Sequence, residues 1–180
     1  RADFNGDGHL DVASCNAISN DVSVLLGNGD GTCKPARHFP LADASQGLFG
    51  LAVAPFSIVA GDFNHDGKPD LVGLASLWPA EYNTLQMLQN TGGLSFADVT
   101  DTLNPGYTIK SGLGNYNPQF VDIDNSGIDT ILLSGGVFNY TTTGHPNYVL
   151  LNDGTGRLHV AMHDAFVQIA HHVDTFHRGM

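Results

Sequence analysis

Basic residues are scarce in this sequence. Only 7 Lys and Arg stand against 18 Asp and Glu, which gives the 180 residues a formal net charge of −11. Nucleic acids and anionic membranes recruit proteins through basic patches, so both are excluded as expected partners. Long apolar runs are missing too, because the longest, residues 48–60, is broken by Pro55 and is too short to span a bilayer. We therefore expect no nucleic-acid partner and no membrane insertion.

Cysteines and catalytic motifs are also few. Cys15 and Cys33 either pair in an oxidising compartment or stay as two free thiols. The sequence contains no nucleophile elbow, no phosphate-binding glycine loop and no dinucleotide fingerprint. Five histidines near the C-terminus have a spacing that permits a zinc site but lack its additional ligands, and Asp98 and Asp101 are interpreted as strand-end caps. We expect no catalytic residue and no enzymatic activity in this segment.

Glycine, by contrast, is abundant. The 22 glycines accompany many Asn, Asp and Ser residues and short apolar runs, and 42% of the residues are hydrophobic. This composition favours an all-β protein with many turns and one substantial core.

Three acidic loops recur along the chain. Residues 3–11 place oxygen-bearing side chains at alternate positions, a Gly at the sixth position and an Asp at the ninth, and residues 62–70 and 122–129 are variants. Oxygen ligands converging in one turn suit Ca²⁺, which takes about six to eight of them. We predict Ca²⁺ as the cofactor. The predicted ligands are Asp3, Asn5, Asp7, the His9 carbonyl and Asp11; Asp62, Asn64, Asp66, Lys68 and Asp70; and Asp122, Asp124, Ser126 and Asp129.

The loops begin like an EF-hand but lack the Glu at position twelve, and short strands follow them instead of helices. A nine-residue loop of this kind that leads into a strand resembles the FG-GAP and VCBS repeats of integrin-like β-propellers. The hairpin segments 24–32 and 149–156 are similar to the hairpin of that family. The resemblance covers about residues 1–160 and implies calcium-binding propeller blades, which occur in adhesion receptors, lectins and appendages of secreted enzymes. In the third copy, one residue fewer before Asp129 and Ser126 at the fifth position imply a distorted, weak or absent site.

The loops start 62 − 3 = 59 and 122 − 62 = 60 residues apart, which indicates three repeated units of four antiparallel strands each. We expect a first blade over 1–55, a second over 56–115, a third over 116–162 and a helix or linker over 163–180. The expected strands are residues 10–14, 22–26 and 33–39; 56–61, 71–74, 84–89 and 94–99; and 119–121, 130–133, 148–151 and 157–161. The helix is expected from Asp164 to His177, on a period of three and four residues.

Two consequences follow from this arrangement. The first blade lacks its innermost strand, and three blades do not close a propeller, which usually has about four to eight. The missing blades therefore come from the remainder of a longer polypeptide or from copies of the same chain.

The expected function is binding. The loops opposite the calcium loops are irregular and carry aromatic side chains beside polar groups, which suits sugar or protein recognition. The candidate ligand-binding residues are Trp78, Tyr82, Phe138, Tyr140 and His145; the alternative is that Trp78 and Phe138 fill gaps between blades. Calcium at extracellular concentration favours a secreted or cell-surface module for carbohydrate binding or adhesion. The rival hypotheses are a self-assembling structural subunit of a ring or filament and the non-catalytic portion of a secreted enzyme.

Overall fold

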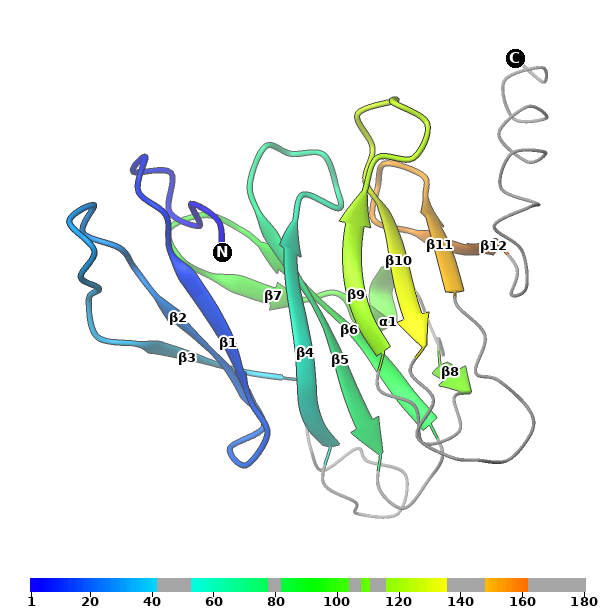
Figure 1. The fold of residues 1–180 in the computed structure, drawn as a ribbon, viewed down its shortest axis with the longest axis horizontal. Helices are drawn as coiled ribbons and strands as arrows, with labels where there is room; N and C mark the ends of the chain where they lie inside the picture. Colours follow the sequence, from blue (N-terminus) through cyan, green and yellow to red (C-terminus); the bar gives the residue numbers. More distant parts are fainter. Residues whose placement is uncertain (42–52, 78–81, 104–107, 111–115, 136–147, 162–180) are drawn as a thin grey trace.

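The computed structural model describes residues 1–41, 53–77, 82–103, 108–110, 116–135 and 148–161. Within these ranges the chain forms three antiparallel sheets that follow one another along the sequence and lie side by side (Figure 1). We call these sheets, each taken together with its acidic loop, units 1, 2 and 3.

Unit 1 has three strands, β1 (Val12–Asn16), β2 (Asp21–Leu25) and β3 (Arg37–Pro40), in the order β1-β2-β3. An isolated bridge pairs Ala2 with Asp11 immediately before β1. Beyond that bridge, the described residues place no strand on the free edge of β1. The expectation that the first blade lacks its innermost strand stays a prediction.

Unit 2 runs in the order β4 (Val53–Gly61), β5 (Asp70–Leu77), β6 (Tyr82–Asn90) and β7 (Phe96–Asp98). A short helix, α1 (Thr100–Leu103), follows, and then β8 (Thr108–Lys110). β7 pairs with the end of β6 and β8 with its beginning. Because β5 occupies the other edge of β6, β7 and β8 together form one interrupted outer strand.

Unit 3 comprises β9 (Tyr116–Val121), β10 (Thr130–Gly135), β11 (Tyr148–Asn152) and β12 (Leu158–Ala161), in the same sequential order. The pairing registers of the units correspond. Val12 pairs with Leu25, Leu71 with Leu88 and Ile131 with Leu150. This correspondence lets residues of one unit be compared with those of the next.

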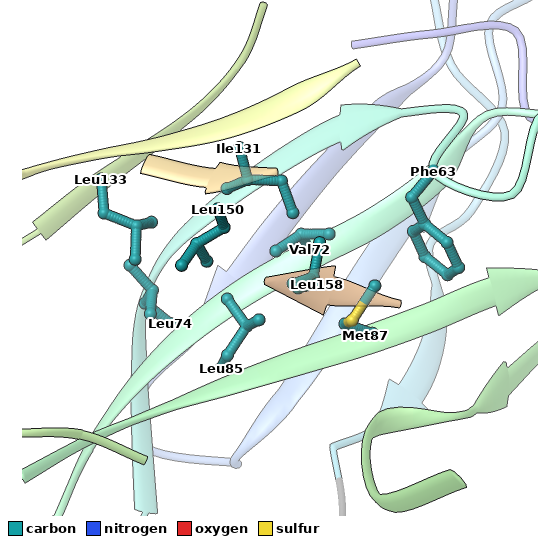
Figure 2. Close-up of a cluster of buried hydrophobic side chains, with 9 residues drawn as sticks. All are labelled: Phe63, Val72, Leu74, Leu85, Met87, Ile131, Leu133, Leu150 and Leu158. Atoms are coloured by element: carbon teal, nitrogen blue, oxygen red, sulfur yellow. The ribbon is translucent and has the colours of Figure 1, made fainter. Parts of the chain in front are cut away.

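Unit 2 lies between the other two units because its strands are apolar on both faces. Side chains that alternate along β5 and β6 point to opposite faces of the sheet. One core cluster joins Leu71 and Leu88 to Val22 and Val24 of unit 1. The other cluster, shown in Figure 2, joins unit 2 to unit 3. Its members are Phe63, Val72, Leu74, Leu85, Met87, Ile131, Leu133, Leu150 and Leu158.

The all-β prediction is confirmed by these sheets, although the described residues form no closed ring. Each predicted strand overlaps an observed one, whereas α1 and β8 were not expected. The predicted C-terminal helix lies outside the described residues. The blade boundaries stay predictions; β4 begins at Val53, three residues before the predicted start of the second blade. Both Cys15 and Cys33 are free thiols, which favours the second of the two alternatives. Among the described residues, no helix is long and apolar enough to cross a bilayer.

Candidate metal-binding loops

The three acidic loops lie at one rim of the molecule. The loops lead into β1, β5 and β10, and Figure 1 shows all three at the upper edge of the sheets. β5 and β10 end at the opposite rim, at Leu77 and Gly135, and the aromatic ligand-binding candidates follow these strands in the sequence. Of those candidates, Tyr82 is the first residue of β6, and the others lie outside the described residues: Trp78, Phe138, Tyr140 and His145.

The first residue of each loop organises the turn by accepting hydrogen bonds from the backbone. The Asp3 carboxylate accepts from the amides of Gly6 at 2.8 Å, Asp7 at 3.1 Å and Gly8 at 2.8 Å. In unit 2, Asp62 accepts from the amides of Asp66 at 3.0 Å and Gly67 at 2.7 Å. The chain can bend this tightly because the fourth and sixth positions have positive φ, as at Gly6 (76°) and Gly8 (85°).

The third loop has the same turn. Asp122 accepts from the amides of Ser126 at 3.1 Å and Gly127 at 2.9 Å, and Ser126 Oγ accepts from the amide of Ile128 at 3.2 Å. Ser126 therefore takes the structural place of Asp7 and Asp66, whose carboxylates accept from the amides of His9 and Lys68, each at 2.9 Å. The hydroxyl preserves the turn but supplies no negative charge.

The ninth position ties each loop to the hairpin of the same unit. Asp11 is fully buried and accepts from the amides of Phe4 and Gly27, both at 2.8 Å. Asp70 is equally buried and accepts from Phe63 at 3.2 Å and Asn90 at 2.7 Å.

In unit 3, strand register places a different residue at the ninth position from the predicted Asp129. Thr130 pairs with Val121 just as Asp70 pairs with Gly61, so Thr130 is the ninth residue and Asp129 the eighth. The third loop has the full nine-residue length, and the shortening inferred from sequence is an artefact of counting to the nearest Asp. A neutral hydroxyl thus replaces the buried carboxylate of the other units.

The carboxylates of the loops are close enough to influence one another. The pKa of Asp70 is raised to about 7, chiefly by burial and also by the charges of Asp66 and Asp62, against the two backbone hydrogen bonds that lower it. Burial likewise raises the pKa of Asp129, and Asp122 and Asp62 act in the same direction. Repulsion of this kind is what a bound cation would relieve.

Other carboxylates are stabilised in the charged form. Hydrogen bonds from the Asn5 side chain and the His9 amide lower the pKa of Asp7. For Asp66, burial opposes ionisation, but the Lys68 side chain, 2.9 Å from Oδ2, together with hydrogen bonds from the Lys68 amide and the Asn64 side chain, outweighs burial and lowers the pKa. The Lys68 ammonium is thus a cation already held at the second loop.

The donor chemistry of the first two loops fits a hard cation, since it consists of carboxylate and amide oxygens with a backbone carbonyl at the seventh position. Across the described residues, no three His, Cys, Asp or Glu side chains gather into a metal cluster. The third loop fits less well, because it lacks a carboxylate at both the fifth and the ninth positions.

Sequence reasoning missed two asparagines that join neighbouring units. Asn90 Nδ2 donates to the Phe4 carbonyl of unit 1 at 2.9 Å and to the Pro69 carbonyl of its own loop at 3.0 Å. Asn152 Nδ2 donates in the same way to Phe63 at 2.7 Å and Asp129 at 3.2 Å. We call Asn90 and Asn152 the inter-unit asparagines. Their place at the first position of a hairpin turn was visible, but their cross-unit partners were not.

Comparisons with known proteins agree with this repeat structure. Residues 3–73 match the model of the FG-GAP-like repeat, which confirms the predicted repeat family for that part of the chain. A solved structure of an Agrocybe aegerita lectin, described as specifically recognising non-reducing terminal N-acetylglucosamine, has a similar fold, with a TM-score of 0.53 and 22% sequence identity. The similarity covers 94% of this chain and 39% of the lectin, so this chain spans well under half the length of that protein. The comparison with curated proteins gave no match.

Proposed function

We propose that this chain is a calcium-stabilised set of β-propeller blades that serves a secreted or cell-surface protein as a carbohydrate- or protein-binding module. The observation that carries the proposal is the fold similarity to a lectin over 94% of the chain, joined to the FG-GAP-like match at its first loops. The net charge of −11 is compatible with loops that are neutralised by cations.

Calcium has a structural role in this proposal. Asp3 and Asp62 order their turns, and Asp11 and Asp70 connect the turns to the hairpins. A cation among these groups would offset their repulsion and make each loop rigid. No reacting group is assigned beside it, and the proposal is a binding module and not an enzyme.

The calcium proposal is tested by isothermal titration and by thermal unfolding in 2 mM Ca²⁺, a concentration of about the extracellular level, and in excess chelator. Saturation at about 100 times Kd should stabilise the fold by roughly 2.7 kcal/mol per site. Asp62→Asn should remove one binding event, whereas Asp30→Asn, in an exposed hairpin, should leave binding intact. Equal melting temperatures in both buffers would contradict the structural role of the metal.

The binding proposal is tested on a glycan array that includes chains ending in N-acetylglucosamine, with and without Ca²⁺. Trp78→Ala and Tyr82→Ala address the aromatic residues predicted from sequence, which stay candidates together with Phe138, Tyr140 and His145. Saturable binding that these substitutions weaken would support a lectin-like module. Absence of binding to any glycan by the folded, calcium-loaded chain would direct the search to protein ligands.

A further inference from the structure

The two contacts between units use the same construction, which we call the socket. In unit 2 the socket consists of Leu71, Leu88, Leu94 and Phe96, and Phe4 from the loop of unit 1 packs in the same cluster. The rings of Phe4 and Phe96 meet edge to face with centroids 5.9 Å apart. Phe4 is only 2% exposed as a result.

Unit 3 repeats this construction with the corresponding residues. Ile131, Leu150 and Leu158 share a cluster with Phe63, which comes from the loop of unit 2 and is fully buried. The fourth position of this socket, equivalent to Leu94, is Gly156, and a Cβ added there would lie 2.8 Å from the Phe63 ring. Gly156 therefore leaves the space that Phe63 fills.

Unit 1 has a socket whose occupant is not among the described residues. Its corresponding residues are Val12, Leu25, Gly31 and Cys33, and a hollow of about 470 Å³ lies over three of them. Val12 is 46% exposed, and a Cβ added at Gly31 would meet no atom within 4 Å. The hollow is lined by Gly8, His9, Leu10, Val12, Gly27, Gly29, Gly31, Thr32 and Cys33.

The third loop carries the matching group. Ile123 stands at the second position of its loop, as Phe4 and Phe63 do in theirs, and it is only partly buried.

We propose that the socket of unit 1 receives the loop of unit 3 from a second copy of this chain, with Ile123 in the place that Phe4 and Phe63 take within one chain. The contact is head-to-tail. It builds a closed ring if the rotation between successive copies adds up to a full turn, and an open assembly otherwise. Two copies would supply about six units, within the usual range for propellers.

The socket of unit 1 lacks an inter-unit asparagine, and this difference predicts the strength of the contact between copies. Gly27 stands where the inter-unit asparagines stand in the other units, so the incoming Ile123 carbonyl finds no side-chain amide. A Cβ at Gly27 would also clash with the Leu10 carbonyl oxygen, which excludes a simple Asn replacement. The association is therefore reversible and weaker than the contacts within the chain.

The test is light scattering and sedimentation velocity on the whole chain up to about 100 μM, with Ca²⁺ present. Val12→Glu and Leu10→Glu place a charge in the socket and should weaken self-association at least about tenfold, because the carboxylate would be desolvated without a partner. Ile18→Glu is the matched control: it makes the same kind of change at a fully exposed residue in the turn between β1 and β2. It should leave association unchanged.

Cross-linking tests the assigned partner directly. Cys33 corresponds to Phe96, the residue that meets Phe4, so Ile123→Cys in a Cys15→Ser background should be joined to Cys33 of another copy by a short bis-maleimide. In the same background, Ile18→Cys, fully exposed in the turn that follows β1, should not be joined to Cys33 of another copy. A chain that stays monomeric over this range, association equally sensitive to Ile18→Glu, or no cross-link in an associating sample would each overturn the proposal.

Discussion

Replacing Asn90 with Ala should destabilise the protein at the junction between units 1 and 2. Asn90 is fully buried, and its amide connects the Phe4 and Pro69 carbonyls while its Oδ1 accepts from the Gly92 amide at 3.0 Å. The substitution leaves two carbonyls and one amide without their side-chain partner.

The magnitude follows from counting these groups. Each buried polar group without a partner costs about 1–3 kcal/mol, but the Gly92 amide is partly exposed and recovers some hydration. The expected loss is about 3 kcal/mol in the free energy of unfolding. With a urea m-value of about 2 kcal/mol/M for a domain of this size, the midpoint should fall by about 1.5 M.

The assay is urea unfolding followed by circular dichroism, in Ca²⁺ and in chelator. Asn28→Ala is the matched control, because Asn28 is exposed and, within the part of the chain that the structure describes, its side chain bonds Thr32 of the same hairpin and no other residue. It should cost under about 0.5 kcal/mol. If Asn90→Ala lowers the free energy of unfolding no more than Asn28→Ala does, water replaces the Asn90 amide, and the inter-unit asparagines do not stabilise the contact between units.

Three further predictions concern the loops. His65→Gly should stabilise the fold by about 0.5–1 kcal/mol in thermal unfolding, because His65 has φ 58° and the relief of that backbone strain exceeds the entropy that Gly adds to the unfolded chain. No gain in stability, or an equal gain from Asn125→Gly, would refute this prediction. In chelator, the free energy of unfolding should fall as the pH rises from about 4 to 7, because folded Asp70, with its raised pKa, keeps a proton that the unfolded chain releases near 3.8; Asp70→Asn should flatten this slope. Thr130→Asp should lower stability in chelator and add one calcium-binding event in titration, and an unchanged stoichiometry would contradict the position assigned to Thr130.

The repeat could be predicted from the sequence because its signals are local. Alternating oxygen-bearing residues and a glycine mark each loop, and the hairpin segments follow at a constant distance. Local chemistry of this kind locates strands to within a few residues. The outer strand of unit 2 was harder, because α1 interrupts it and β8 has only three residues, too few to show any period.

The candidate site was predicted less completely, for two reasons. The ninth position of the third loop depends on strand register, and the pairing of Thr130 with Val121 cannot be read from spacing when an Asp stands one residue earlier. The inter-unit asparagines depend on contacts between residues 86 and 89 positions apart. A hairpin Asn ordinarily bonds its own turn, so nothing local distinguishes these two.

The acidic loops and the contacts between units are connected by shared hydrogen bonds. Asn90 bonds the eighth residue of its own loop and the second residue of the loop before it, while Asp70, the ninth residue, accepts from the Asn90 amide. A cation that orders one loop would therefore also fix the donor that holds its neighbour. Asn152 repeats these two side-chain bonds between units 2 and 3. A cation bound in one loop would therefore also restrict the neighbouring units, and this would keep the opposite rim, where the binding residues are proposed, in a constant arrangement.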